Sequence, residues 1–278
     1  MNKRMENNKN TMIITGTSSG FGRETAKLFA SKGWNVIASM RTPEKEAELL
    51  HIENVLVVKL DVQEPESIRS AINQGINKFG KIDAVVNNAG YGLMGIFEAS
   101  DRDQVQKQFD VNVFGMMDVT RALIPHFRSN GSGMVINISS FGGQVSLPIA
   151  SLYNASKYAV EGFSESLAYE LAAINVAVKI IEPGGVHTNF GASLDFIANP
   201  PAEYSNLITT VMGRYGKVTE HLKKANAADV AQTIFQAATD GSTQLRYVVG
   251  EDAKFYIDNK MKNSDADYLK KMRGLFID

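Results

Sequence analysis

The sequence predicts a three-layer, doubly wound α/β fold with a parallel sheet of about seven strands. Short apolar runs alternate along the chain with longer segments of helical periodicity, and this order of elements is typical of a parallel sheet covered by helices. The runs are continuously apolar, as in VLVVKL and MVINI, so both faces of each strand are expected to be buried. At 278 residues, one large domain fits this pattern better than two small ones.

Each predicted strand is bounded by Gly, Asn or Asp. The predicted strands are Met12–Thr15, Asn35–Ser39, Val55–Lys59, Ala84–Asn87, Met134–Ile138, Val176–Glu182 and Arg246–Val249. Between them the periodicity predicts the helices Arg23–Ser31, Glu66–Phe79, Asp103–Arg128, Asn154–Ala173 and Ala228–Thr239. Residues 11–278 are therefore expected to form a single domain, and the polar residues 1–10 a disordered tail.

One segment interrupts the alternation. Residues 189–225 are too long for an ordinary connection and mix aromatic and aliphatic side chains with Gly and Pro. We interpret them as a substrate-loop insertion, with extra surface helices as the alternative. Met94, Leu147 and Met212 are candidates to line an apolar pocket, although methionines also commonly fill gaps in a core.

Composition excludes several classes of function. The net charge is -1, from 29 basic and 30 acidic residues, and no block of like charge suggests a nucleic acid or an anionic membrane as a partner. The absence of cysteine excludes disulfides, thiolate zinc sites and a cysteine nucleophile. The 4 histidines show no ligand spacing, so no metal site is expected. Without a signal peptide or a membrane-spanning apolar run, the chain is predicted to be cytoplasmic.

A glycine-rich turn follows the first predicted strand, where residues 15–22 read TGTSSGFG. Gly16 permits a tight turn, Gly20 allows the backbone to approach a pyrophosphate, and Gly22 allows the next helix to pack closely on the sheet. Free N–H groups and the positive helix end favour an anion there. A tight strand-to-helix turn without a ligand is the alternative, but the position in the first βα unit favours a dinucleotide-binding Rossmann fold.

The end of the second predicted strand indicates which dinucleotide is bound. A site for NAD usually carries an acid about 20 residues after the glycines, whereas this chain reads ASMRT at 38–42 and has no acid before Glu44. Arg41 can bind a 2′-phosphate through a charge-assisted fork, and the Thr42 hydroxyl can add a contact. We therefore predict NADP(H) as the cofactor, with a solvated arginine at a strand end as the alternative.

A second group of residues points to proton transfer. Tyr153 and Lys157 are four residues apart, so on a helix their side chains share one face. A nearby ammonium and an oxidised nicotinamide would lower the pKa of the Tyr153 phenol and allow it to exchange protons. Ser140 follows an apolar strand, where its hydroxyl can bond a substrate oxygen. Tyr256 and Lys260 repeat the spacing without such a serine, and we interpret them as an ordinary amphipathic-helix pair.

Together these residues resemble the short-chain dehydrogenase/reductase family over roughly residues 11–250, nearest its hydroxysteroid- and retinol-dehydrogenase-like branch. The resemblance extends to LDV at 60–62, NNAG at 87–90, DVNV at 110–113 and PGGVHT at 183–188. It implies that Asn112, Ser140, Tyr153 and Lys157 are catalytic, with Asn112 holding a water for a proton relay. The residues implied to bind the cofactor are Gly16, Ser18, Ser19, Gly20, Phe21, Gly22, Met40, Arg41, Thr42, Asp61, Val62, Asn88, Ala89, Gly90, Tyr153, Lys157, Pro183, Gly184, Val186 and Thr188.

The predicted function is hydride transfer between NADP(H) and a small, apolar carbonyl compound or secondary alcohol. The alternatives are an NAD-linked alcohol dehydrogenase that uses the same residues and an NADPH-sensing regulator without turnover. The resemblance also implies a homodimer or homotetramer, paired through the predicted helices Asp103–Arg128 and Asn154–Ala173.

Overall fold

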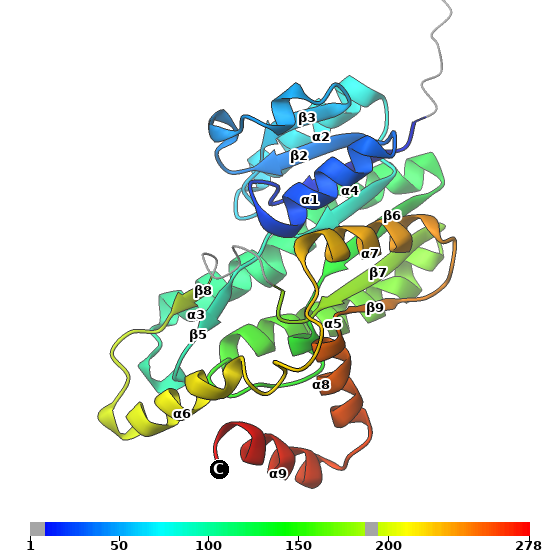
Figure 1. Cartoon of the computed structure of the whole chain (residues 1–278). Helices are drawn as coiled ribbons and strands as arrows, with labels where there is room; N and C mark the ends of the chain where they lie inside the picture. The colour runs from blue at the N-terminus through cyan, green and yellow to red at the C-terminus, as the bar shows by residue number, and fades with distance from the viewer. Residues whose placement is uncertain (1–8, 187–193) are drawn as a thin grey trace, which may run out of the picture.

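The computed structural model describes residues 9–186 and 194–278 and contains a seven-stranded, entirely parallel sheet (Figure 1). The strand order is β3-β2-β1-β4-β6-β7-β9, so the chain first winds outward from β1 to β3 and then returns to build the other half. This confirms the predicted doubly wound fold. The strands are β1 (Thr11–Thr15), β2 (Asn35–Met40), β3 (Val55–Lys59), β4 (Ala84–Asn87), β6 (Gly133–Ile138), β7 (Val176–Pro183) and β9 (Arg246–Val249).

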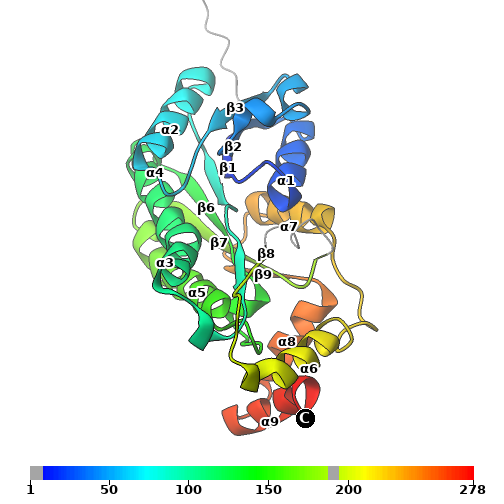
Figure 2. The same cartoon turned by 90° about the vertical axis from the view of Figure 1, so that its left-hand side faces the viewer.

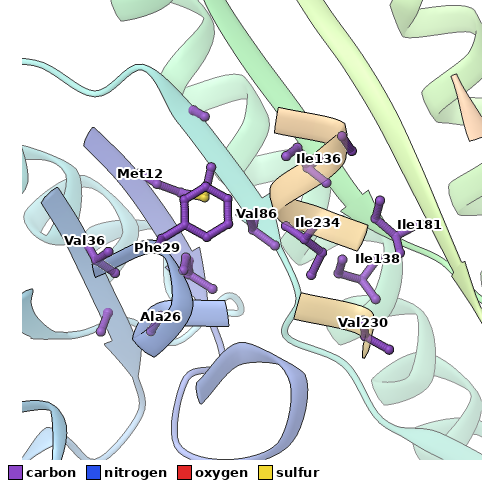
Figure 3. Packing of buried hydrophobic residues seen from close by; sticks show 14 of the residues in the cluster. Met12, Ala26, Phe29, Val36, Val86, Ile136, Ile138, Ile181, Val230 and Ile234 are labelled. Carbon is purple, nitrogen blue, oxygen red and sulfur yellow. The ribbon is translucent and has the colours of Figure 1, made fainter. Parts of the chain in front are cut away.

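Helices cover both faces of the sheet and make three layers (Figure 2). One face carries α1 (Gly20–Ser31) and α7 (Ala227–Thr239), and the other carries α2 (Pro65–Phe79), α4 (Met116–Asn130) and α5 (Ser151–Ala172). On the first face, Phe29 of α1 and Ile234 of α7 pack on strand residues such as Met12 (Figure 3). The continuous apolar runs of the sequence are thus explained by burial on both sides.

The predicted helix Asp103–Arg128 is wrong as a single α-helix. The structure has α3 (Arg102–Phe109), then a π-helical segment Asp110–Gly115, then α4. A Cβ on Gly115 would lie 2.7 Å from Val62, so the wider turn brings this backbone directly against the loop after β3. Apolar spacing does not distinguish a single π turn from a regular helix, because it adds only one residue to the turn.

The segment after β7 contributes to a small two-stranded sheet beside the main one. From residue 194 onward it contains β8 (Leu194–Phe196), which pairs in parallel with β5 (Gly92–Met94), and α6 (Ser205–Tyr215). The structure therefore gives residues 194–225 regular elements of their own.

Two helices that the sequence analysis did not assign follow β9. They are α8 (Glu251–Met261) and α9 (Asp265–Phe276), and with α6 they lie beyond the carboxyl ends of the strands (Figure 1). Tyr256, Tyr268 and Phe276 are buried together in a separate aromatic cluster there. Within the described parts of the chain, no helix is long and apolar enough to cross a membrane.

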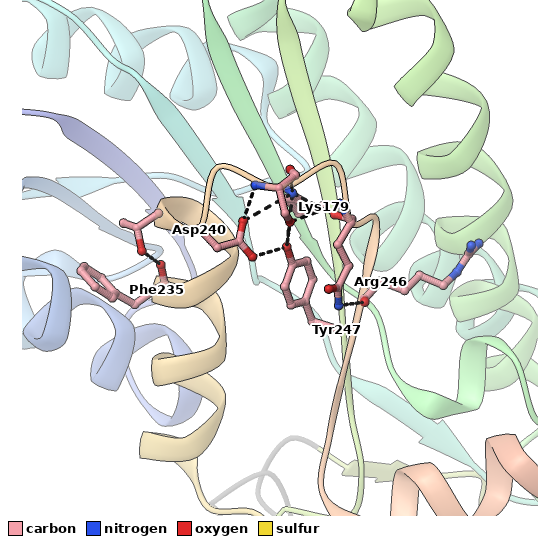
Figure 4. Close-up of polar contacts among 8 residues, drawn as sticks. Lys179, Phe235, Asp240, Arg246 and Tyr247 are labelled. Atoms are coloured by element: carbon pink, nitrogen blue, oxygen red, sulfur yellow. Dashed lines mark hydrogen bonds and ion pairs between the residues drawn. The ribbon is translucent and has the colours of Figure 1, made fainter.

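A buried lysine fixes the edge strand β9. Lys179 of β7 donates to the carbonyls of Ser242 at 2.6 Å and Gln244 at 2.8 Å, and to the Tyr247 hydroxyl at 3.2 Å (Figure 4). The carboxylate of Asp240 lies 4.0 Å from the ammonium and balances its charge. These bonds hold the loop before β9 against the sheet, so a charged side chain is tolerated within a buried strand.

Candidate active site

A cleft of about 740 Å³ lies at the carboxyl ends of the strands, where the strand order reverses. Its walls come from the segments that follow β1, β2, β3, β4, β6 and β7, together with α5 and the C-terminal helices. The predicted residues that line it are Gly16, Ser18, Ser19, Gly20, Phe21, Met40, Arg41, Asp61, Val62, Asn88, Ala89, Gly90, Ser140, Tyr153, Lys157, Pro183, Gly184 and Val186. Parts of the chain far apart in sequence thus converge on one crevice.

The glycine turn has the geometry of an anion cradle. Gly16 and Gly20 have φ values of +73° and +55°, which disfavour other residues. A Cβ on Gly20 would meet nothing within 4 Å, whereas one on Gly22 would lie 2.3 Å from the Gly16 carbonyl oxygen. Gly22 therefore faces the protein and sets how closely α1 approaches β1. The Ser19 side chain does not cap α1, so the first N–H groups of the helix are left for another acceptor where Ser19 and Gly20 line the cleft.

Asn88 holds this turn against β4. Its side-chain amide donates to the carbonyls of Thr15 at 2.8 Å and Gly16 at 3.0 Å. In return, the Thr15 hydroxyl accepts the N–H groups of Asn88 and Ala89, each at 3.0 Å. The predicted contribution of Asn88 to cofactor binding therefore includes fixing the backbone of the glycine turn.

Arg41 is exposed at the end of β2 and lines the cleft. The other arginine near this end, Arg23, is held by the buried Glu46 carboxylate at 2.6 Å and is not placed to bind a phosphate. Thr42, predicted to add a hydroxyl contact, does not line the cleft, because its backbone turns away into a short 3-10 helix. Thr188 lies outside the described residues.

Three of the four predicted catalytic residues line the cleft, namely Ser140, Tyr153 and Lys157. Tyr153 and Lys157 lie one turn apart on α5, and the Lys157 ammonium is 5.9 Å from the centre of the Tyr153 ring. The ammonium donates to the carbonyl of Ile138 at 2.9 Å, which ties α5 to the end of β6. Ser140 begins the 3-10 turn after β6, and its hydroxyl accepts the N–H of Gly142 at 3.1 Å. Its own proton is therefore available to another acceptor.

The electrostatics of the floor differ from the prediction for Tyr153. Burial raises the pKa of the phenol above its ordinary value, and the neighbouring Ser140 hydroxyl only opposes this rise. Burial also lowers the pKa of Lys157 to about 8, against the negative charge of Glu161. The protein alone thus does not lower the tyrosine pKa, and the positive charge of an oxidised nicotinamide would have to contribute.

Asn112 lies in the π-helical segment and is buried. Its amide nitrogen donates to the Tyr91 carbonyl at 2.9 Å and the Ser156 hydroxyl at 3.1 Å, and its oxygen accepts the Tyr91 N–H at 3.0 Å. Both amide protons are used, so the side chain has little capacity left for a water. Asn112 does not line the cleft, although its neighbour Val111 does, so its predicted catalytic role stays a prediction.

Several cleft residues were missed by the sequence analysis. Tyr256 is buried, lines the cleft and stacks on Phe141 with ring centroids 5.2 Å apart, so it is not an ordinary amphipathic-helix residue. Asp252 at the start of α8 accepts the N–H of Gly185 at 2.7 Å. Tyr215 lines the cleft and donates to the Pro148 carbonyl at 2.8 Å. No motif marks Asp252 or Tyr256, since only the packing of α8 brings them to the site, whereas Tyr215 lies in the predicted substrate-loop insertion.

The apolar candidates divide between two cavities. Met94 and Leu147 line the main cleft. Met212 does not, and instead lines a separate apolar cavity of about 330 Å³ between α6 and the β5–β8 pair. The described part of segment 189–225 contributes Leu194, Asp195, Tyr215, Thr219 and Lys224 to the main cleft.

Comparison with known proteins agrees with this geometry. Residues 10–195 match the family model for short chain dehydrogenases. An uncharacterized oxidoreductase of Schizosaccharomyces pombe is 40% identical over 244 residues, which cover 85% of this chain and 100% of the relative. A 3-ketodihydrosphingosine reductase of Bacteroides thetaiotaomicron is 37% identical over 179 residues, covering 64% of this chain and 65% of the relative.

Solved structures extend the likeness to the whole fold. A short-chain dehydrogenase from Streptomyces avermitilis superposes with a TM-score of 0.83 at 32% identity, covering 96% of this chain and 97% of that one. A 3-ketoacyl-(acyl-carrier-protein) reductase from Brucella melitensis, complexed with NADH, gives 0.73 at 27% identity over 87% and 96% of the two chains. The protein ElxO with NADP bound gives 0.71 at 26% identity over 87% and 96%. The sequence match, the sheet order and the cleft together place the chain in the short-chain dehydrogenase/reductase family of oxidoreductases.

Proposed function

We propose that this protein transfers a hydride between NADP(H) and the carbonyl or secondary alcohol carbon of a small, mostly apolar molecule. The observation that carries this proposal is the convergence of Ser140, Tyr153 and Lys157 on one cleft floor beside the glycine turn. The glycine turn also fits a dinucleotide pyrophosphate. A Cβ on Gly22 would collide with backbone, whereas the space next to Gly20 is open.

The preference for NADP(H) rests on the end of β2. Arg41 borders the cleft there, and the ion pairs of the described chain do not include it. The nearest acid along the sequence is Glu44, so no carboxylate directly follows the strand to repel a 2′-phosphate. Relatives of similar fold are bound to NADH in one case and NADP in another, so this preference belongs to the residues of this chain.

Each floor residue has a distinct role in the proposed reaction. When bound, the nicotinamide supplies or accepts the hydride. Ser140 donates its free proton to the substrate oxygen, which stabilises the negative charge that develops there during reduction. Tyr153 delivers a proton to that oxygen. Lys157 favours the phenolate by its charge and, by family resemblance, holds the nicotinamide ribose.

The substrate end of the cleft favours an apolar molecule. Its lining includes the side chains of Met94, Leu147, Leu194, Tyr215 and Tyr256. Two relatives are named as reductases of 3-keto compounds, which supports a ketone as the reacting group. We further propose a cytoplasmic homodimer or homotetramer.

Tyr153→Phe tests the proposal. The variant should fold and bind NADPH with wild-type affinity but lose nearly all turnover, because the proton donor is removed while packing is kept. NADPH consumption is followed with a panel of aldehydes, ketones and diketones, and binding is followed by nucleotide fluorescence. Tyr204→Phe is the matched control, since this tyrosine lies outside the cleft and its hydroxyl donates to exposed Glu98 at 2.8 Å.

Activity above a small fraction of wild type in Tyr153→Phe would remove Tyr153 from its role. Tight NADPH binding without turnover of any compound by the wild type would favour an NADPH-sensing regulator instead.

A further inference from the structure

A group of polar and charged side chains, built around two buried glutamates, lies next to Lys157 but outside the cleft. It consists of Glu161 of α5, Glu182 at the end of β7, Gln144 after the Ser140 turn and Arg246 at the start of β9. Glu182 is 0% exposed and Glu161 is 5% exposed. In Figure 4, Arg246 leaves β9 away from the Lys179–Tyr247 group. Its Nε lies 3.0 Å from Glu161 Oε2 and 3.6 Å from Glu182 Oε1.

Glu161 continues the helix face that carries the proposed catalytic residues, since Tyr153, Lys157 and Glu161 follow one another at four-residue intervals. The turn after Ser140 packs directly on this face. A Cβ on Gly143 would lie 2.8 Å from Glu161 Cγ and 3.0 Å from the Lys157 carbonyl oxygen. A charge on Glu161 therefore acts on Lys157 through protein rather than through solvent.

The hydrogen bonding of the two acids leaves one atom of each unexplained. Glu161 Oε1 and Glu182 Oε2 are buried and have no hydrogen-bond partner among the described residues. Two ionised carboxylates would each leave a buried acceptor without a donor, at a considerable desolvation cost. A single proton held between the two carboxyl groups would let one of these oxygens donate a hydrogen bond and the other accept it. Both carboxyl groups lie against the same atom, Arg246 Nε, at 3.0 Å for Glu161 and 3.6 Å for Glu182, so they are side by side.

The balance of charge favours the same arrangement. Arg246 also binds Glu165 at 2.6 Å, so one guanidinium faces three carboxyl groups. The other polar side chains packed against the two acids are uncharged. Gln144 donates to Glu182, and the Ser139 hydroxyl lies next to Gly143 in the turn after Ser140. Burial and then the charge of Glu161 raise the pKa of Glu182 to about 8, so this acid is mainly protonated at neutral pH.

We propose that Glu161 and Glu182 share one proton and that the single negative charge left on the pair keeps the neighbouring Lys157 ammonium protonated. Glu161 is thus a positioning residue that acts through Lys157, and the inference rests on the function proposed for that lysine. Few other contacts stabilise the charged form of this ammonium. It donates to the Ile138 carbonyl and faces the Tyr153 ring, while burial lowers its pKa to about 8 and Glu161 raises it.

The test compares Glu161→Gln and Glu182→Gln with Glu165→Gln, a control that contacts the same arginine from a side chain 49% exposed to solvent. We expect Glu161→Gln to move the alkaline loss of kcat/KM, and of NADPH affinity, to lower pH by about one unit. Glu182→Gln leaves the full charge on Glu161, so its alkaline limb should not move to lower pH. Glu165→Gln should follow the wild type.

Thermal unfolding gives a second readout that does not depend on activity. The pKa of Glu182 in the fold, about 8, lies above its ordinary value of 4.5. The protonated acid therefore stabilises the fold fully below pH 4.5, and this contribution is lost as pH rises through 8. Between pH 5 and 9 the Tm of the wild type should fall by several degrees relative to Glu182→Gln. If Glu161→Gln does not fold, two other measurements test the shared proton. One is this comparison of Tm values, and the other is the pH titration of the Glu182 ¹³C carboxyl resonance, which is assigned by its absence from Glu182→Gln.

Alkaline limbs of wild type and Glu161→Gln that coincide, or a uniform loss of activity at every pH, would overturn the proposal. So would a Glu182 carboxyl resonance that titrates below pH 6. If the wild type reduces no carbonyl compound, the proposed function fails while the NADPH-binding and unfolding series still test the pair.

Discussion

Gly22 illustrates how one missing side chain shapes the site. A Cβ there would lie 2.3 Å from the Gly16 carbonyl oxygen of the glycine turn and 2.6 Å from the Asn88 amide, which holds that turn against β4. Any larger residue must push α1 away from β1. The requirement for glycine is therefore steric at this position, whereas at Gly16 it is conformational.

Gly22→Ala should lower stability by about 1–3 kcal/mol through overpacking and weaken NADPH binding at least tenfold, by about 1.4 kcal/mol. Gly162→Ala is the matched control, because a Cβ at this α5 position meets nothing within 4 Å. It should gain about 0.5–1 kcal/mol from its higher helix propensity. Denaturant unfolding and NADPH titration measure both effects. Equal stability of the two variants would contradict the assigned role of Gly22.

Arg41→Ala separates the two dinucleotides. Loss of a charge-assisted fork should weaken NADPH binding about ten- to hundredfold and leave the affinity for NADH nearly unchanged. Dissociation constants for both nucleotides, at two salt concentrations, provide the measurement. Arg102→Ala is the control, because this arginine is exposed. Arg23→Ala would not serve, since it breaks the ion pair with buried Glu46. An unchanged NADPH preference would favour the NAD-linked alternative.

The sequence predicted the cleft residues that belong to motifs better than those that the C-terminal helix α8 brings to the cleft. Gly16, Arg41, Ser140 and Tyr153 belong to motifs whose spacing carries chemical meaning, and all four line the cleft. Asp252 carries no such signal, because its role depends on a contact between residues 67 positions apart in the chain. The pKa of Tyr153 was also beyond the sequence, since burial that opposes ionisation exists only in the folded protein.

At the scale of elements, strands were predicted to within a residue or so, because continuous apolar runs bounded by turn residues have few other solutions. The β5–β8 pair was missed, since strands of 3 residues have too short a pattern to detect. The start of α1 at Gly20 was placed three residues late, because glycines lower the apparent helix propensity where the cofactor turn requires them.

Helix α8 reaches the cleft through Asp252. Its Oδ2 accepts the Gly185 N–H, and its Oδ1 lies where a Cβ on Gly184 or Gly250 would be, at 2.2 and 2.6 Å. This acid therefore connects the loop after β7, predicted to bind the nicotinamide, with the C-terminal helices.

Asp252→Ala should raise KM for the cofactor several-fold and lower stability by about 1–3 kcal/mol, because the Gly185 N–H loses its partner. Steady-state kinetics with varied NADPH and thermal unfolding give the two values. Asp258→Ala on the same helix removes only a surface ion pair with Lys262 and should change stability by less than about 1 kcal/mol. A cofactor KM equal to the wild-type value would show that the loop is positioned without Asp252.

At the scale of the whole molecule, the helices on the α4–α5 face carry large exposed side chains. Phe114 in the π-helical segment is 48% exposed, and Tyr169 of α5 is 77% exposed. Both lie within the segments predicted from family resemblance to pair between subunits. Exposed aromatic side chains are frequent anchors of protein interfaces.

Light scattering coupled to size exclusion should therefore give a mass of two or four chains of 30.4 kDa. Tyr169→Glu places a charge in the proposed interface and should shift the population toward smaller species. Leu269→Glu is the control, since this side chain is also exposed but belongs to α9, on a different part of the molecule. A monomeric wild type would exclude the proposed pairing.

The contact between Asp252 and the loop after β7 has a thermodynamic consequence. If nucleotide binding favours the conformation in which Gly185 is bonded to this carboxylate, occupancy of the crevice and closure of α8 and α9 are linked. Such coupling is reciprocal, so the factor by which nucleotide suppresses amide exchange in these terminal helices equals the factor by which their local opening weakens nucleotide binding. A mutation of Phe276, which does not line the cleft, would then change the affinity for the dinucleotide without contacting it.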